Sequence, residues 1–250
     1  MNILLVAATR EEIGPLLESG VLGTNNGKRS TEQEDLCNTE KTKNQLQKSV
    51  DGESSFVRSS FNASQSNETA FHTLITGVGM VATAYALGQH LATKQYDLAI
   101  NLGIAGSFDR DIALGEVVEI TQDTFTESGA ENDQDFITLD ALGFGQITYT
   151  THARLTQYSS RQAVRQVTAA TVNTVHGNDT SIANLQQRIS LQLESMEGAA
   201  FFYACQQAGV PALQIRAVSN YVEKRNRDAW KIGLAIKNLN TFAEALLRGL

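Results

Sequence analysis

A Ser-Asn pair, Ser219-Asn220, follows an apolar run over 212–218 that is typical of a buried strand. In sheets of parallel strands, ligands bind beyond the carboxyl ends of the strands, so this pair is a candidate binding site. The amide of Asn220 both donates and accepts hydrogen bonds but does not act as an acid. The pair therefore predicts recognition of a polar ligand through hydrogen bonds.

Two carboxylates begin predicted helices. Glu197 lies at the start of a helical pattern over 196–208 that is otherwise nearly all apolar. A carboxylate there is either an exposed first-turn charge or a buried acceptor with a specific partner. Glu11 and Glu12 follow the first predicted strand, 3–8, where acidic residues ordinarily complement the helix dipole. The sequence leaves both the chemical and the capping interpretation open for these residues.

Two glycine-rich segments also follow predicted strands. Gly77-Val78-Gly79 joins a strand over 73–78 to a helix over 81–92, and 101–107 follows a strand over 98–102. Glycines let the backbone approach a ligand, and a helix N-terminus favours a polar or anionic group. The first segment does not complete the dinucleotide-binding pattern Gly-x-Gly-x-x-Gly, because Ala82 occupies the third position.

These segments belong to an alternation of strands and helices. Further strands are predicted over 116–120 and 171–175, and the tail over 228–250 is predicted to be a long amphipathic helix. Alternation of this kind indicates a layered α/β fold with helices on both faces of a sheet. The exception is a polar insertion at about 22–70, predicted to be disordered. It is interpreted as a tolerated loop expansion rather than a regulatory or partner-binding segment.

Composition narrows the class of protein. The chain has 250 residues with 42% hydrophobic and 19% charged residues and a net charge of −7, which suits one domain and disfavours a nucleic-acid binder. No apolar run reaches the roughly 20 residues that span a bilayer, and the N-terminus indicates a strand rather than a signal sequence. Cys37 and Cys205 lie in unlike contexts, so we expect no disulfide and a cytoplasmic location. The four histidines show no ligand spacing, and we expect no metal.

Taken in order, these motifs resemble the purine nucleoside phosphorylase and nucleosidase superfamily. The resemblance rests on Ser-Met-Glu-Gly-Ala-Ala at 195–200 and Arg-Ala-Val-Ser-Asn at 216–220, and it covers nearly the whole chain outside the insertion. Segments 195–205 and 216–230 resemble, within it, the futalosine hydrolase family. The resemblance implies one nucleosidase domain over 1–250 and a three-layer α/β/α sandwich with a central mixed sheet. It also implies a homo-oligomer that uses no cofactor.

The resemblance also implies a role for each candidate residue. Glu12, rather than its neighbour Glu11, would position and deprotonate the attacking water. Glu197 would accept hydrogen bonds from the ribose 2′ and 3′ hydroxyls, and Met196 would pack on the ribose. Arg216 would support the Glu197 carboxylate or another acidic group. The implied substrate-binding set is completed by Ser219, Gly79, Ala105 and Gly106.

Asn220 bears on the substrate. Adenine-specific nucleosidases of the superfamily carry Asp at the matching point, whereas the Asn amide donates to purine N7 and to the O6 of hypoxanthine. This implies a 6-oxopurine nucleoside and agrees with futalosine, a hypoxanthine nucleoside with a carboxyphenyl-ketone arm. The implied reaction is hydrolysis of its N-glycosidic bond, releasing hypoxanthine and dehypoxanthine futalosine in the alternative menaquinone pathway.

Several alternatives remain at the level of sequence. The chain could be a phosphorolytic enzyme, a methylthioadenosine or S-adenosylhomocysteine nucleosidase, or a non-catalytic nucleoside-binding protein. His176 either faces the base or is an ordinary loop histidine. Candidates for holding the arm of the substrate are basic or aromatic residues that could equally be solvated or packed in the core: Arg10, Tyr221, Lys224, Arg225, Arg227, Trp230 and Lys231.

Overall fold

The computed structural model describes residues 1–23, 69–133, 135–151, 153–159 and 164–250. Most of the predicted insertion at 22–70 lies outside the described residues, as do Cys37 and His152. Cys205 is buried and is a free thiol. No helix in the described ranges is long and apolar enough to cross a membrane.

The centre of the fold is a mixed sheet in the strand order β10-β4-β8-β9-β3-β1-β2, with β7 paired to β4. Most pairs are parallel, but β10–β4, β3–β9 and β4–β7 are antiparallel. Because β10 also pairs with β3, the strands β3, β10, β4, β8 and β9 close into a ring. The strands are β1 Asn2–Ala7, β2 Ala70–Ile75, β3 Leu98–Ser107, β4 Val117–Phe125, β7 Thr148–Thr150, β8 Arg165–Thr171, β9 Leu193–Ser195 and β10 Ala212–Tyr221.

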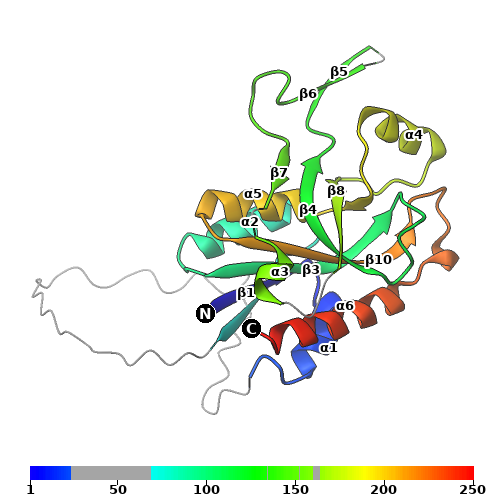
Figure 1. Cartoon of the computed structure of the whole chain (residues 1–250). Helices are drawn as coiled ribbons and strands as arrows, with labels where there is room; N and C mark the ends of the chain where they lie inside the picture. Colours follow the sequence, from blue (N-terminus) through cyan, green and yellow to red (C-terminus); the bar gives the residue numbers. More distant parts are fainter. Residues whose placement is uncertain (24–68, 134, 152, 160–163) are drawn as a thin grey trace, which may run out of the picture. The chain divides into compact units, whose positions relative to one another are not determined.

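Helices cover both faces of the sheet (Figure 1). Helices α2 and α5 pack together on one face, and α1 and α6 pack on the other. The three-layer sandwich with a central mixed sheet is therefore confirmed. The helices are α1 Arg10–Glu18, α2 Met80–Leu91, α3 Leu155–Tyr158, α4 Asp179–Arg188, α5 Gly198–Ala208 and α6 Ile232–Leu247, with a 3-10 turn at Arg227–Ala229 and a separate β5–β6 hairpin, Gly129–Asn132 and Asp135–Thr138.

The sequence dictates these layers through its apolar pattern. Strand β1 is apolar at nearly every position because helices bury it on both sides. Along β3, successive side chains enter the two cores in turn, Ala99 on the α2–α5 side and Ile100 on the α1–α6 side. Helix α5 ends at Gly209, whose φ of 69° is a left-handed conformation that favours glycine.

Three predicted elements differ from the structure. The segment 101–107 is not a loop, because β3 continues to Ser107 with β10 and β9 paired on its two sides. The predicted strand at 171–175 is wrong. Strand β8 covers Arg165–Thr171, and its polar first residues concealed it. The tail is divided, with the 3-10 turn preceding α6.

Candidate active site

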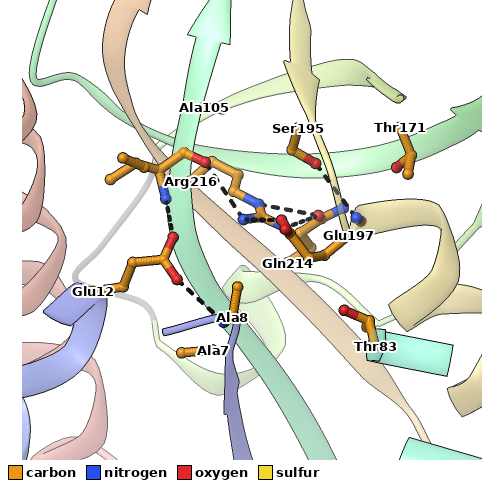
Figure 2. A network of polar contacts seen from close by, with 12 residues as sticks. Ala7, Ala8, Glu12, Thr83, Ala105, Thr171, Ser195, Glu197, Gln214 and Arg216 are labelled. Atoms are coloured by element: carbon orange, nitrogen blue, oxygen red, sulfur yellow. Dashed lines mark hydrogen bonds and ion pairs between the residues drawn. The ribbon is translucent and has the colours of Figure 1, made fainter. Parts of the chain in front are cut away.

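Arg216 forms the centre of a buried polar network at the meeting of β3 and β10. Its side chain is 1% exposed, and its position on β10 lies beside Gly103 of β3. Nε and Nη2 donate to Oε1 of Gln214 at 3.2 and 3.1 Å, and Nη1 lies 3.5 Å from the carbonyl oxygen of Ile104. Figure 2 shows the guanidinium between Glu12 on one side and Gln214 and Glu197 on the other. A buried cation held this way requires nearby negative charge.

Glu12 reaches this network from the first turn of α1. Its Oε2 accepts the backbone N–H groups of Ala8 and Thr9, each at 3.1 Å, which caps the helix. Its Oε1 accepts the N–H of Ile104 on β3 at 3.1 Å. Burial raises the pKa of Glu12, and the Arg216 charge opposes that rise. Glu12 is therefore a helix cap and also a buried carboxylate beside a cation, whereas Glu11 is exposed.

Asn240 of α6 fixes the backbone from which Glu12 projects. Its Nδ2 donates to the carbonyl of Glu12 at 2.8 Å, and its Oδ1 accepts the N–H of Leu16 at 2.9 Å. These are the two groups that would otherwise bond to each other along α1. The amide therefore ties the first helix to the last one directly beneath the carboxylate.

Glu197 is the buried acceptor of the two interpretations that the sequence left open. It is 6% exposed and occupies the N-cap position of α5. Its Oε1 accepts the N–H of Gly79 at 3.0 Å, and its Oε2 lies 3.6 Å from Nη1 of Arg216. Gly79 has a φ of 98°, which favours glycine, and begins α2. The segment expected to approach a ligand thus contacts the Glu197 carboxylate.

Behind Arg216, a chain of buried hydrogen bonds returns to α5. Gln214 donates from Nε2 to Asp123 Oδ2 at 3.0 Å, and Thr171 donates to Asp123 Oδ1 at 2.7 Å. The Thr171 hydroxyl accepts the N–H of Ala199 at 2.7 Å, two residues after Glu197. Burial raises the pKa of Asp123 to about 6, against the lowering effect of its Thr171 and Gln214 hydrogen bonds. This chain fixes Arg216 and the start of α5 to one frame.

Sequence reasoning missed Asp123, Gln214 and Thr171. Asp123 falls in the part of β4 beyond the predicted strand, and Gln214 lies inside an apolar run. The available signal was two polar residues, Gln214 and Arg216, at alternate positions of a strand otherwise buried, because unpaired polar groups do not persist in a core.

We expect Gly103→Ala to disrupt this network without straining the backbone. A Cβ at Gly103 would lie 2.1 Å from Nη1 of Arg216 and 3.0 Å from Oε1 of Glu12. The guanidinium must move, and overpacking of this kind costs about 1–3 kcal/mol of unfolding free energy. Denaturant unfolding and steady-state kinetics should show lower stability and at least a tenfold loss of kcat/KM, roughly the effect of 1.4 kcal/mol.

Gly88→Ala is the matched control for this substitution. Gly88 is exposed within α2, and its Cβ would meet nothing within 4 Å. It should leave kinetics unchanged and stabilise the helix by about 0.5–1 kcal/mol. If Gly103→Ala also left the kinetics unchanged, the position of the Arg216 guanidinium would not matter for activity.

Ser219 and Asn220 lie at the end of β10, next to β3. The Ser219 hydroxyl contacts the carbonyl oxygen of Ala105 at 3.2 Å and Oδ1 of Asn220 at 2.8 Å. Asn220 Nδ2 donates to the Tyr221 carbonyl at 3.1 Å, and Asn220 pairs with Gly106 across a bulge. A carbonyl only accepts, so the nitrogen of the amide must face Tyr221, and its second hydrogen remains for another acceptor.

The other predicted site residues are distributed more widely. Met196 is half-buried between β9 and α5. Arg225 lies over the Trp230 ring, and Arg110 lies over the Tyr221 ring and contacts Glu223. These rings are therefore already in contact with protein cations. The remaining candidates for the substrate arm, Arg10, Lys224, Arg227 and Lys231, are exposed.

Comparisons with known proteins agree with this fold. The chain matches the family model described as "Phosphorylase superfamily" over residues 3–249, and it belongs to that superfamily. It is 36% identical over 148 residues to a futalosine hydrolase of Streptomyces coelicolor, a match covering 58% of this chain and 63%, less than two thirds, of that relative. It is 32% identical to a futalosine hydrolase of Acidothermus cellulolyticus, covering 69% of this chain and 73% of the relative.

The chain is therefore a member of the futalosine hydrolase family, a family of enzymes within that superfamily. The native structure of a futalosine hydrolase of Helicobacter pylori has the same fold. It superposes with a TM-score of 0.72 at 15% identity, over 100% of this chain and 98% of the other.

Proposed function

We propose that this chain hydrolyses the N-glycosidic bond of futalosine, releasing hypoxanthine and dehypoxanthine futalosine in the alternative menaquinone pathway. The observation that carries the proposal is the placement of two buried carboxylates, Glu12 and Glu197, around one buried cation, Arg216. Asn220 follows four residues after Arg216, at the end of the same strand. One carboxylate can take a proton from an attacking water, and the other can stabilise the positive charge that develops on the ribosyl group.

Glu12 would take the proton of the attacking water. A carboxylate offers about four acceptor positions, and three are filled by the N–H groups of Ala8, Thr9 and Ile104. The remaining position, on Oε1, is available to a water molecule. Because burial raises the pKa of Glu12, the carboxylate is a stronger base than an exposed one. As the C1′–N9 bond breaks, its electron pair leaves with the base and the water oxygen bonds to C1′.

Glu197 would hold the ribose and oppose the positive charge that grows on its ring. Within the described part of the chain, Oε1 accepts a single hydrogen bond, from Gly79, and Arg216 lies beside Oε2. Further acceptor positions are thus available for the 2′ and 3′ hydroxyls. Preorganised charge in a buried site is the largest contributor to many enzymatic rate accelerations.

The placement of Arg216 favours hydrolysis over phosphorolysis. Its N–H groups are directed at Gln214, Ile104 and Glu197, so it is not presented to a phosphate ion. Arg10 is exposed. The test is release of hypoxanthine from futalosine, followed by chromatography, with and without inorganic phosphate. We expect equal release in both; strict dependence on phosphate would refute hydrolysis, and no release would refute futalosine as substrate.

We expect Asn220→Asp to shift the preference toward 6-aminopurine substrates. The one amide hydrogen that Tyr221 leaves free donates at the N7 and O6 edge of a 6-oxopurine, whereas a carboxylate accepts and leaves O6 facing another acceptor. The ratio of kcat/KM for futalosine to that for its 6-amino counterpart should fall by about tenfold or more. Asn238→Asp, on α6 and bonded to the Gly115 carbonyl, is the control with the same chemical change. An unchanged ratio in Asn220→Asp would remove Asn220 from base recognition.

A homo-oligomer is also proposed, from the family resemblance alone. Light scattering during gel filtration measures the mass in solution. A particle of 27.1 kDa, the mass of one chain, would contradict it.

A further inference from the structure

Three positions on neighbouring strands form one row at the end of the sheet. Gly106 of β3 pairs with Asn220 of β10 on one side and with Glu194 of β9 on the other. Paired positions direct their side chains to the same face, and Gly106 contributes none. With strands about 4.8 Å apart, the backbones that carry Asn220 and Glu194 are separated by about 10 Å. Two polar side chains therefore flank a glycine on the face where the proposed base-recognition amide lies.

Glu194 holds His176 by two contacts. Its Oε1 accepts the backbone N–H of His176 at 2.9 Å, and its Oε2 lies 2.6 Å from Nδ1 of the ring. The side chains of His176 and Glu194 are 13% and 4% exposed. Burial raises the pKa of Glu194, and the His176 contacts oppose that rise. Neither residue has a part in the reaction proposed above, so this buried pair needs another explanation.

The loop that carries His176 lies next to the strand ends of the site. The His176 ring meets Phe108, the residue after β3, edge to face with centroids 6.4 Å apart. The carbonyl of Gly177 accepts the N–H of Arg225 at 3.1 Å, which joins this loop to the segment following Asn220. His176 is thus placed beside the end of β3, and its loop is joined to the segment that follows β10.

The contact with Glu194 decides which ring nitrogen can accept. A carboxylate only accepts, so Nδ1 carries a proton, and in the neutral ring Nε2 then has a lone pair and no hydrogen. Among the described residues, no hydrogen-bond partner of Nε2 is present, and this atom is not buried. In its neutral form, the ring held by Glu194 therefore has one fixed acceptor, Nε2.

We propose that His176 is a second base-recognition residue, whose Nε2 accepts the N1–H of a 6-oxopurine, and that Glu194 is the positioning residue that sets its tautomer. A 6-oxopurine has a donor at N1 and an acceptor at O6, and a 6-aminopurine has the reverse. Asn220 donates at the O6 and N7 edge, and His176 accepts at N1. The proposal rests on the proposed function for the class of base, and it adds the residue that reads N1.

Equilibrium binding of free hypoxanthine and adenine by calorimetry tests this directly. We expect His176→Ala to weaken hypoxanthine binding about tenfold or more, because N1–H loses its acceptor, while adenine binding is unchanged or improved. His72→Gln, on the exposed edge strand β2, is the control and should leave both affinities unchanged. Equal weakening of both bases in His176→Ala would overturn the proposal.

Glu194→Gln separates tautomer control from a merely structural role. The Gln oxygen can still accept the backbone N–H of His176, but its NH₂ group donates to Nδ1 and moves the ring proton to Nε2. Nε2 then donates, which suits N1 of adenine. We expect the ratio of hypoxanthine to adenine affinity to fall about tenfold or more, with adenine binding gaining. A structural role predicts equal losses for both bases together with a lower melting temperature, and that result would refute the proposal.

The turnover of the unaltered protein distinguishes this inference from the proposed function. If the protein binds hypoxanthine more tightly than adenine but does not release it from futalosine, futalosine is not the substrate. Recognition of N1–H by His176 is then unaffected. If it hydrolyses futalosine and Glu194→Gln leaves the affinity ratio unchanged, the inference fails and the proposed function stands.

Discussion

Replacement of Glu12 by Gln is expected to reduce kcat by about 10²–10⁴-fold, because the attacking water loses its base. Substrate binding should be spared, since the ribose and base contacts assigned above belong to other residues. Steady-state kinetics measure the loss of kcat. Calorimetry on the inactive variant measures its affinity for the substrate.

The same substitution should also destabilise the chain. Both oxygens of Glu12 accept backbone N–H groups, and the amide nitrogen of Gln cannot do so on either side. One or two buried donors lose their acceptor, at about 1–3 kcal/mol for each. Kinetics must therefore be measured well below the melting temperature of the variant. Glu11→Gln, exposed in the same helical turn, is the control and should change neither quantity.

The pH profile gives an independent view of Glu12. A base must be ionised to act, so kcat/KM should be constant at higher pH and fall as the pH drops through the pKa of the carboxylate. Because burial raises that pKa, the acid limb should have its midpoint above 4.5, the ordinary value for Glu. Wild-type turnover in Glu12→Gln, or an acid limb that this substitution leaves in place, would show that the base lies elsewhere. Complete loss of substrate binding in the variant would favour a binding role over a catalytic one.

Replacement of Glu197 by Gln is expected to lower kcat/KM by about 10²–10³-fold. The variant loses the negative charge that stabilises the positive charge developing on the ribose in the transition state. Electrostatic stabilisation of this kind is strongest in a buried site. It also leaves Arg216, 1% exposed, without the carboxylate 3.6 Å away. Breaking a buried ion pair by removing one partner costs about 3–5 kcal/mol of stability.

A truncated ligand separates the loss of the ribose contacts from the loss of stability in Glu197→Gln. A nucleoside lacking the 2′ and 3′ hydroxyls should bind wild type and variant with the same affinity, whereas the complete nucleoside should bind the variant more weakly. Glu244→Gln, which removes an exposed ion pair with Arg248 on α6, is the control for loss of charge and should have little effect. Equal kcat/KM for Glu197→Gln and wild type would remove Glu197 from the proposed reaction.

The sequence alone predicted the layers because these depend on local pattern. Apolar runs and helical spacing identified β1, β10, α2 and α5 to within a few residues, because the buried face of an element determines the spacing of its apolar residues. The segments around Glu197 and Asn220 carried the family resemblance. The short strand β9 and the polar start of β8 were not predictable, because their residues are fixed by pairing with strands distant in the chain.

Which acidic and polar groups meet was decided only by the tertiary structure. The resemblance assigned Arg216 to Glu197 or to another acidic group. The fold places its Nη1 3.6 Å from Glu197, and Gln214, itself bonded to Asp123, accepts from Nε. The row formed by Glu194, Gly106 and Asn220 likewise depends on the register of three strands from separate parts of the chain. The sequence determined the residue types and their elements. The register and the closure of the sheet determined their neighbours, because long-range pairing leaves no periodicity to read in a single chain.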